Sequence, residues 1–288
     1  MQSAAKHLAG STNPIGATVL ITTTREMLRC ALHDRPLFLF WNKSRLSLQA
    51  LSNEYPAPAQ ALYFQVMERL FVTGIGTDVG KTVVSAILTE ALRADYWKPV
   101  QAGLEPTTDS ATVRALVQNP TSHFFPERYR LQMPASPHKA AAAEDLTIRP
   151  QDFELPATAN HLVVEGAGGL LVPLAPGFLL ADLLVQLDLA VIVVSRHYLG
   201  SINHTLLTLE ALHARGVRVR GLVFNGDPTP ATEQFISQHT AVPVLPPLRV
   251  EATISPEMVT RYAAGFRTWF EQSWRTTPTP SAQVLPSL

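Results

Sequence analysis

The sequence predicts an α/β protein in which a doubly wound parallel sheet carries helices on both faces. An apolar run at residues 70–72 leads into a glycine-rich turn, and apolar residues at helical spacing follow directly. Apolar strands and amphipathic helices then alternate to residue 272. Such alternation is typical of parallel sheets covered on both sides. With 288 residues, of which 46% are hydrophobic, the chain can bury a sizeable core.

The glycine-rich turn has the pattern of a phosphate-binding loop, and residues 70–82 read LFVTGIGTDVGKT. Glycines let successive backbone N–H groups point inward, and a helix that begins near Lys81 adds its positive end. In this pattern Lys81 reaches the outer phosphates and the Thr82 hydroxyl ligates magnesium. The loop is a variant, because Ile75 stands where the common motif has its first glycine. A turn without a ligand is the alternative, but the intact GKT between strand and helix favours a P-loop NTPase-type fold.

Composition excludes several classes of protein. The formal net charge is zero and the pI about 7.1, so the charge balance indicates no nucleic-acid or membrane-surface partner. Cys30 is the single cysteine, which rules out an intramolecular disulfide and a cysteine-based zinc site. No apolar run approaches the roughly 20 residues that a membrane helix needs. We therefore expect a cytoplasmic protein whose partners are small molecules or a second copy of itself.

The chain divides by composition into three parts. Residues 1–66 show little periodicity, and we expect an extension that is poorly ordered or not native, with Met67 as the working start. An excess of Lys and Arg there weakly resembles a targeting peptide, and an accessory element is a separate alternative. Residues 67–273 are predicted to form the P-loop domain and residues 274–288 a flexible tail. Removal of residues 1–66 is expected to retain folding and activity, because every motif lies beyond them.

The order of elements follows from periodicity and turn residues. After the first strand and helix, strands are expected at residues 96–100, 161–169, 190–194, 219–225 and 242–245. Helices are expected from residue 109 and at 139–145, 179–187, 202–215, 231–239 and 256–272. Residues 118–135 are expected to be irregular with one short extended piece. Ser136 and Pro137 suit the start of a helix. His138 beside them could serve either in packing or in the chemistry of the site.

Two strands end in side chains that suit a ligand site. Lys98 lies near the end of the strand at residues 96–100, which Pro99 would end or place at a sheet edge. Glu165 ends an apolar strand and precedes Gly-Ala-Gly-Gly, so it is placed to reach a metal. Ligands bind at the carboxyl ends of strands in open α/β sheets. The alternatives are an exposed lysine, a solvated glutamate and, for Asp109, an acid that only starts a helix.

Taken together, the motifs resemble one known family. The segments FVTGIGTDVGKT, WKPVQAG, Asp109, PASPHKAA, VVEGAGGLLVPL, YLGSINH and GLVFN occur in the order and spacing of dethiobiotin synthetase. The resemblance runs from about residue 68 to residue 249. It implies that 7,8-diaminononanoate takes up CO2 as a carbamate, that ATP phosphorylates the carbamate, and that the second amine closes the ureido ring. The products would be dethiobiotin, ADP and phosphate, in biotin biosynthesis.

The resemblance also implies roles for individual residues. Lys98 would stabilise the carbamate and the transferring phosphoryl group, and Asn225 would read the nucleotide base. Magnesium would be held by Thr82, Asp109 and Glu165. The nucleotide would contact Thr77, Asp78, Val79, Gly80, Lys81, Thr82, Val83, Asp109, Glu165, Gly166, Ala167, Gly168 and Asn225. A homodimer would hold the diamine at its interface, where substrate meets Ala102, Gly200, Ser201 and Asn203. A helix N-cap and its first turn would also explain Ser201 and Asn203.

The chain departs from the family pattern at two places, and two other functions compete. Residues 74–77 read GIGT where many relatives have GTDT, so an acid near the diamine must come from Asp78. Ala102 replaces the usual Ser or Thr, which removes a hydroxyl contact. One alternative function is a regulatory or partitioning ATPase, but its additional loop lysine is missing between Gly74 and Gly80. The other, an inactive binding module, is weakened by the intact GKT and acids.

Overall fold

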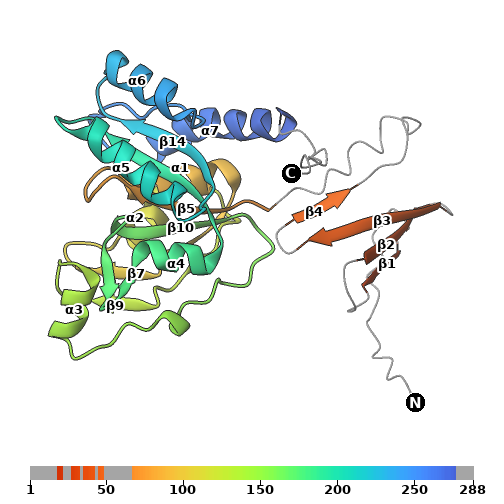
Figure 1. The fold of residues 1–288 in the computed structure, drawn as a ribbon, viewed down its shortest axis with the longest axis horizontal. Helices are drawn as coiled ribbons and strands as arrows, with labels where there is room; N and C mark the ends of the chain where they lie inside the picture. The colour runs from red at the N-terminus through yellow and green to blue at the C-terminus, as the bar shows by residue number, and fades with distance from the viewer. Residues whose placement is uncertain (1–17, 22–26, 33–34, 43–44, 49–66, 277–288) are drawn as a thin grey trace, which may run out of the picture. The chain divides into compact units, whose positions relative to one another are not determined.

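The computed structural model describes residues 18–21, 27–32, 35–42, 45–48 and 67–276 (Figure 1). The chain separates into two compact units, one of residues 66–276 and one of residues 1–65 with 277–288. In the second unit, strands β1 (Thr18–Ile21), β2 (Met27–Leu32), β3 (Arg35–Asn42) and β4 (Arg45–Leu48) pair antiparallel in chain order. These strands were not predicted from the sequence, because strands of four to eight residues show too few alternations to establish a period.

The larger unit is built on a six-stranded sheet, which confirms the doubly wound α/β prediction. The strand order is β14-β13-β5-β10-β6-β8, and every neighbouring pair is parallel. A parallel order that departs from chain order requires a crossover between strands, which the helices supply. The strands are β5 (Arg69–Gly74), β6 (Asp95–Trp97), β8 (Phe124–Phe125), β10 (Leu162–Gly169), β13 (Ala190–Arg196) and β14 (Val219–Asn225).

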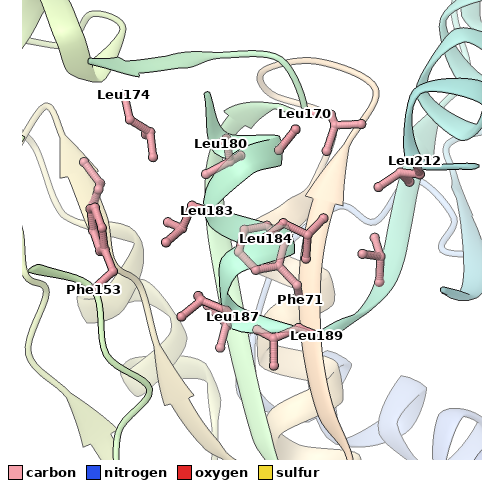
Figure 2. Close-up of a cluster of buried hydrophobic side chains, with 14 of the residues drawn as sticks. Phe71, Phe153, Leu170, Leu174, Leu180, Leu183, Leu184, Leu187, Leu189 and Leu212 are labelled. Atoms are coloured by element: carbon pink, nitrogen blue, oxygen red, sulfur yellow. The ribbon is translucent and has the colours of Figure 1, made fainter. Parts of the chain in front are cut away.

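Helices cover both faces of this sheet, because successive side chains of each strand point to opposite sides. On β5, Leu70 and Val72 pack into a core with helices α1 (Lys81–Leu92), α2 (Asp109–Leu116) and α7 (Pro256–Thr276). Phe71 faces the other core, which Figure 2 shows against the leucines of α4 (Leu180–Leu187). Helices α5 (Ser201–His213) and α6 (Pro230–Thr240) extend that second layer. Each such leucine stabilises the fold by about 1.5 to 3 kcal/mol.

Two expected strands differ from the structure, and proline explains both. The strand expected at residues 96–100 stops at Trp97, and Val100–Ala102 (β7) pairs instead with Tyr129–Leu131 (β9) in a separate parallel pair. Pro99 lies at the break and has no N–H to donate to the ladder. Residues 242–245 form a single isolated parallel bridge to β14, at Val244, and a second follows at Leu248, since prolines interrupt the segment at 243, 246 and 247.

The end of the domain also differs from the expected boundary. Helix α7 continues through Thr276, so residues 274–276 are helical and not part of a loose tail. The Trp274 indole N–H donates to Glu68 Oε1 at 2.9 Å, and its ring stacks on His161 with centroids 5.9 Å apart. These contacts join the last turn of the helix to the start of β5. The rest of the expected tail, residues 277–288, lies outside the described residues.

The remaining elements are short and lie, along the sequence, between the strands of the six-stranded sheet. Helix α3 (Pro137–Ala143) begins where Ser136 and Pro137 predicted, although the Ser136 side chain makes no capping hydrogen bond. A 3-10 turn, η2, covers Pro150–Asp152, and β11 (Pro173–Ala175) pairs with β12 (Phe178–Leu179) as a hairpin. Among the described residues, no helix combines the length and the apolar character needed to cross a membrane.

Candidate active site

The phosphate loop joins the end of β5 to the start of α1, as predicted. At both Gly74 and Gly80 an added side chain would displace a neighbouring side chain. An added Cβ on Gly74 would lie 2.4 Å from Val79 Cγ2, and one on Gly80 would lie 2.4 Å from Asn225 Nδ2. Gly80 also has φ +99°, a conformation that side chains disfavour. The backbone therefore curls closely against its neighbours, with its amides available at the helix start.

Lys81, the first residue of α1, extends over this loop. Its Nζ donates to the Gly76 carbonyl at 3.0 Å, and only 7% of the residue is exposed. Burial lowers the pKa of Lys81, although the nearby Glu165 carboxylate acts in the opposite direction. The Gly76 carbonyl is a neutral acceptor, so an incoming phosphate would give this buried ammonium group a negative partner in direct contact.

A charged cluster of Thr82, Lys98, Asp109 and Glu165 lies beside the loop. The Thr82 hydroxyl lies 2.9 Å from Asp109 Oδ1 and 3.0 Å from Glu165 Oε1. Lys98 Nζ lies 2.6 Å from Asp109 Oδ2 and 3.1 Å from Glu165 Oε1. The structure thus brings together the three expected magnesium residues and the expected catalytic lysine.

Four separate elements position the cluster. Thr82 lies in the first turn of α1, Lys98 follows β6, Asp109 begins α2, and Glu165 lies on β10. Because β6 and β10 are neighbouring parallel strands, their carboxyl ends meet at one edge of the sheet. Gln101 was not anticipated as part of this arrangement: its Oε1 accepts from the Asp109 N–H at 3.1 Å.

The charged side chains of the cluster stay ionised because they pair with one another. Lys98 is 3% exposed, which shows that the alternative of an ordinary exposed lysine is wrong. Burial acts to lower the pKa of Lys98, but the carboxylates of Glu165 and Asp109 outweigh burial and raise it above its usual value. Burial acts to raise the pKa of Asp109, and the charge and hydrogen bond of Lys98 outweigh that and lower it. A protonated lysine therefore faces an ionised aspartate.

Tyr96 completes the surroundings of Glu165 and was missed by the sequence analysis. Its hydroxyl donates to Glu165 Oε2 at 2.9 Å, and its side chain is fully buried. Burial, followed by the Glu165 charge, raises the pKa of Tyr96 well above its usual value. The i, i+2 spacing of Tyr96 and Lys98 could have indicated a shared direction, because alternate residues of a strand face the same side.

The glycine-rich end of β10 packs against the phosphate loop. Gly169 is the register partner of Gly74, and a Cβ on Gly168 would lie 3.6 Å from Thr77 Oγ1. A Cβ on Gly166 would lie 2.8 Å from the Phe71 ring. Close packing thus explains the small residues that follow Glu165. The expected nucleotide-binding residues thus occupy two adjoining segments: Gly166, Ala167 and Gly168 follow Glu165 on β10, and Thr77, Asp78, Val79, Gly80, Lys81, Thr82 and Val83 form the loop and the start of α1.

Asn225 ends β14 and reaches back to the loop. Its Nδ2 donates to the Val79 carbonyl at 2.8 Å. This hydrogen bond holds the loop backbone against the end of β14. Arg196 Nη1 donates to the Asp78 carbonyl at 3.0 Å. A pocket of about 480 Å³ adjoins these contacts and is lined by Ile75, Gly76, Thr77, Asp78, Val79, Arg196, His197, Tyr198 and His204.

The residues expected to contact the diamine come from the start of α5 and the end of β7. Gly200, at φ +100°, occupies the N-cap of α5, so Ser201 is the first helical residue and not the cap. Ser201 is buried, whereas Asn203 is exposed in the first turn. Ala102 ends β7. Among the described residues, none of these four hydrogen-bonds to the charged cluster.

The donor atoms of the cluster fit magnesium. The described part of the chain contains no group of three or more His, Cys, Asp or Glu that would form a protein-only metal site. Mg²⁺ is usually bound through one or two carboxylates together with phosphate oxygens and water. Two carboxylates and one hydroxyl, converging beside a phosphate loop, match that preference.

Comparison with known proteins identifies the family. Residues 68–258 match the protein family described as an AAA domain. The ATP-dependent dethiobiotin synthetase BioD of Cytophaga hutchinsonii is 51% identical over 207 residues, which is 71% of this chain and 100% of that protein. The chain belongs to the dethiobiotin synthetase family. The dethiobiotin synthetase of Christiangramia forsetii is 50% identical over 197 residues, 68% of this chain and 95% of the relative.

Family membership decides between the two enzyme-like functions that the sequence left open. The dethiobiotin synthetase of Brucella ovis is 48% identical over 189 residues, 66% of this chain and 89% of that protein. A ParA family ATPase from Chlorobium tepidum covers 72% of this chain and 93% of its own, at 13% identity and a TM-score of 0.44. Identity of about one half to the synthetases assigns the chain to ATP-dependent dethiobiotin synthetases and not to the partitioning ATPases.

Proposed function

We propose that this protein joins CO2 to 7,8-diaminononanoate and closes the ureido ring, with ATP as co-substrate and Mg²⁺ as cofactor. The products are dethiobiotin, ADP and phosphate. The observation that carries the proposal is the cluster of Thr82, Lys98, Asp109 and Glu165 beside the phosphate loop. Phosphoryl transfer depends mainly on positioning and on neutralising negative charge, and this cluster with the loop offers both.

Each part of the site has a role in this reaction. The loop backbone and Lys81 would bind the phosphates, while Thr82, Asp109 and Glu165, which lie together, would hold the metal, directly or through water. Bound magnesium would neutralise charge on the phosphate oxygens. Lys98 stays protonated because its two carboxylate neighbours raise its pKa, so it acts as a fixed positive charge and not as a base. It stabilises the carbamate and the transferring phosphoryl group.

Asn225 reads the base in this proposal. Since its Nδ2 already donates to the Val79 carbonyl, the Oδ1 atom is the one that remains to meet a ligand. A carboxamide oxygen accepts hydrogen bonds, so it suits the exocyclic amino group of adenine. The same geometry would disfavour guanine, which presents a carbonyl oxygen in the corresponding place.

The protein works as a cytoplasmic homodimer in this proposal, with the diamine at the interface. Gly200, Ser201 and Asn203 of one subunit contact substrate bound mainly by the other, and Ala102 contributes through its backbone. The neighbouring Leu199 supports an interface here, because its side chain is completely exposed and Tyr198 is 42% exposed. Residues 1–66 take no part in the reaction.

The direct test is ADP release by the purified full chain, measured with diamine and bicarbonate, with each alone and with neither. Release should require both, because the carbamate must form before ATP can phosphorylate it. Lys81→Ala serves as the control for contaminating ATPase activity. Equal turnover with neither compound would favour a switch ATPase and contradict the proposal.

A further inference from the structure

We propose that Tyr96 is a positioning residue of the active site, acting through Glu165. Its hydroxyl fixes the carboxylate so that Oε1 faces Thr82 and Lys98 while Oε2 stays anchored by Tyr96. This inference rests on the proposed function, which assigns Glu165 to magnesium. It adds a residue to which neither the motifs nor the family resemblance gave a role.

The contact is rigid on both sides. Tyr96 lies on β6 and Glu165 on the adjacent β10, whose backbones pair in parallel register. Both residues are completely buried, and the hydroxyl lies 2.9 Å from Oε2. The Tyr96 ring also packs against Phe124, with centroids 6.1 Å apart. Neither partner has room to move independently, so the hydroxyl marks one fixed position for Oε2.

The two oxygens of Glu165 are used differently. Oε1 lies within hydrogen-bond distance of Thr82 Oγ1 at 3.0 Å and of Lys98 Nζ at 3.1 Å. Oε2 accepts from Tyr96. In the proposed function Thr82 would help to hold the metal and Lys98 would face the phosphoryl group, so both residues would exchange their contacts to Oε1 for contacts to ligands. The contact from Tyr96 is the one of the three that the ligands leave in place.

Because the two oxygens of Glu165 have different partners, the Tyr96 hydroxyl has a function beyond packing: it orients the carboxylate. A carboxylate free to rotate would present either oxygen, or both, and its distance to the metal would vary. Hydrogen bonds from outer partners orient metal ligands, and their loss typically weakens metal binding or activity by about 10- to 100-fold. The hydroxyl of Tyr96 is placed to supply such a bond, and its ring is placed to fill the core.

The test is an isothermal calorimetric titration of ADP into the protein, repeated at a series of Mg²⁺ concentrations. Tyr96→Phe keeps the ring and removes only the hydroxyl. We expect the Mg²⁺ concentration that gives half of the metal-dependent gain in ADP affinity to rise by about tenfold or more. Binding of ADP without metal should be unchanged, because the phosphate loop is untouched.

A matched control is available in Tyr129→Phe. The Tyr129 hydroxyl also donates to a carboxylate, that of Asp152, but this pair lies outside the active site, by β9 and η2. The control should leave the Mg²⁺ dependence unchanged while losing a tyrosine–carboxylate hydrogen bond, here a partly buried one, together with the contacts of the hydroxyl to Thr147 and Arg149. Thermal unfolding of both variants reports the loss of stability separately from the loss of metal response.

A double-mutant cycle with Glu165→Gln tests whether Tyr96 acts through that carboxylate. If it does, Tyr96→Phe has no further effect on Mg²⁺ dependence when residue 165 is already an amide. Additive effects, or an unchanged Mg²⁺ dependence in Tyr96→Phe itself, overturn the role of Tyr96. Equal weakening of metal-free ADP binding also overturns it. If ADP binding by the wild-type protein does not respond to Mg²⁺, the proposed metal site fails, and this inference fails with it.

Discussion

The phosphate loop and the charged cluster lie side by side but are built in opposite ways. The loop is one continuous segment, and the side chains that fix it bond to its backbone carbonyls: Lys81 to Gly76, Asn225 to Val79 and Arg196 to residue 78. The cluster comes from four separate elements, and its contacts join one side chain to another. The loop therefore depends on backbone shape, and the cluster depends on the balance of charge.

This difference determines which changes each region tolerates. The loop should withstand the loss of an exposed side chain but not the addition of a Cβ where the backbone is crowded. The cluster should tolerate substitutions that change the shape of a side chain but keep its charge. It should not tolerate the loss of a charge, because the opposite charge that it neutralises would be left unpaired. Substitutions at Lys98, Gly80 and Asp78 test these statements.

The largest effect is expected for Lys98→Gln. Removing a charge that faces developing negative charge in the transition state typically costs about 10²- to 10³-fold in turnover. Nucleotide affinity should change little, because it depends on the phosphate loop. Steady-state ADP release and a direct nucleotide titration on the same preparation measure the two quantities. Near-normal turnover would remove the catalytic role, and an equal loss of affinity would make Lys98 part of the nucleotide site.

Stability must be separated from chemistry in this variant, because Lys98 and Glu165 are 3% and 0% exposed. Breaking a buried ion pair by removing one partner costs about 3 to 5 kcal/mol of stability. Arg220→Gln is the matched control: Arg220 Nε pairs with Glu68 Oε1 at 3.2 Å, with side chains 12% and 8% exposed. That pair lies at the amino end of β5, away from the site. The control should lower the unfolding temperature without lowering turnover.

An intermediate effect is expected for Gly80→Ala. An alanine there has a Cβ 2.4 Å from Asn225 Nδ2 and a positive φ, whose strain costs about 1 to 2 kcal/mol. If that strain is relieved by distorting the loop, nucleotide affinity falls by about 5- to 30-fold. Gly177→Ala is the control, because Gly177 has φ +72° but nothing within 4 Å of an added Cβ. Similar affinity losses in both variants would contradict a local role for the crowding at Gly80.

The same contrast explains what the sequence could predict. The sheet and the loop follow from patterns within short windows, such as the alternation of Leu70, Phe71 and Val72 between two cores. The resemblance placed Lys98 and Glu165 in the site, but their pairing became visible only when β6 and β10 were adjacent. Tyr96 was missed for this reason, because its partner Glu165 is 69 residues away in the chain. Gln101 was missed although Asp109 is only 8 residues away, because the contact depends on how the loop between β7 and α2 turns back.

The smallest effect on the loop is expected for Asp78→Asn, although this residue has a second role to test. Asp78 is exposed with φ +56°, and asparagine tolerates that conformation as well as aspartate does. The contact from Arg196 is to the Asp78 carbonyl, which the substitution keeps. Nucleotide affinity should therefore change by no more than about 0.5 kcal/mol, as for an ordinary surface substitution. The KM for the diamine should rise, because this carboxylate is the acid that the loop offers to an ammonium group. A rise in the diamine KM with constant ADP affinity would separate the side chain of Asp78 from its backbone. Constant values of both would locate the acid elsewhere in the protein, and a loss of both would show that the loop depends on this charge as the cluster depends on Lys98.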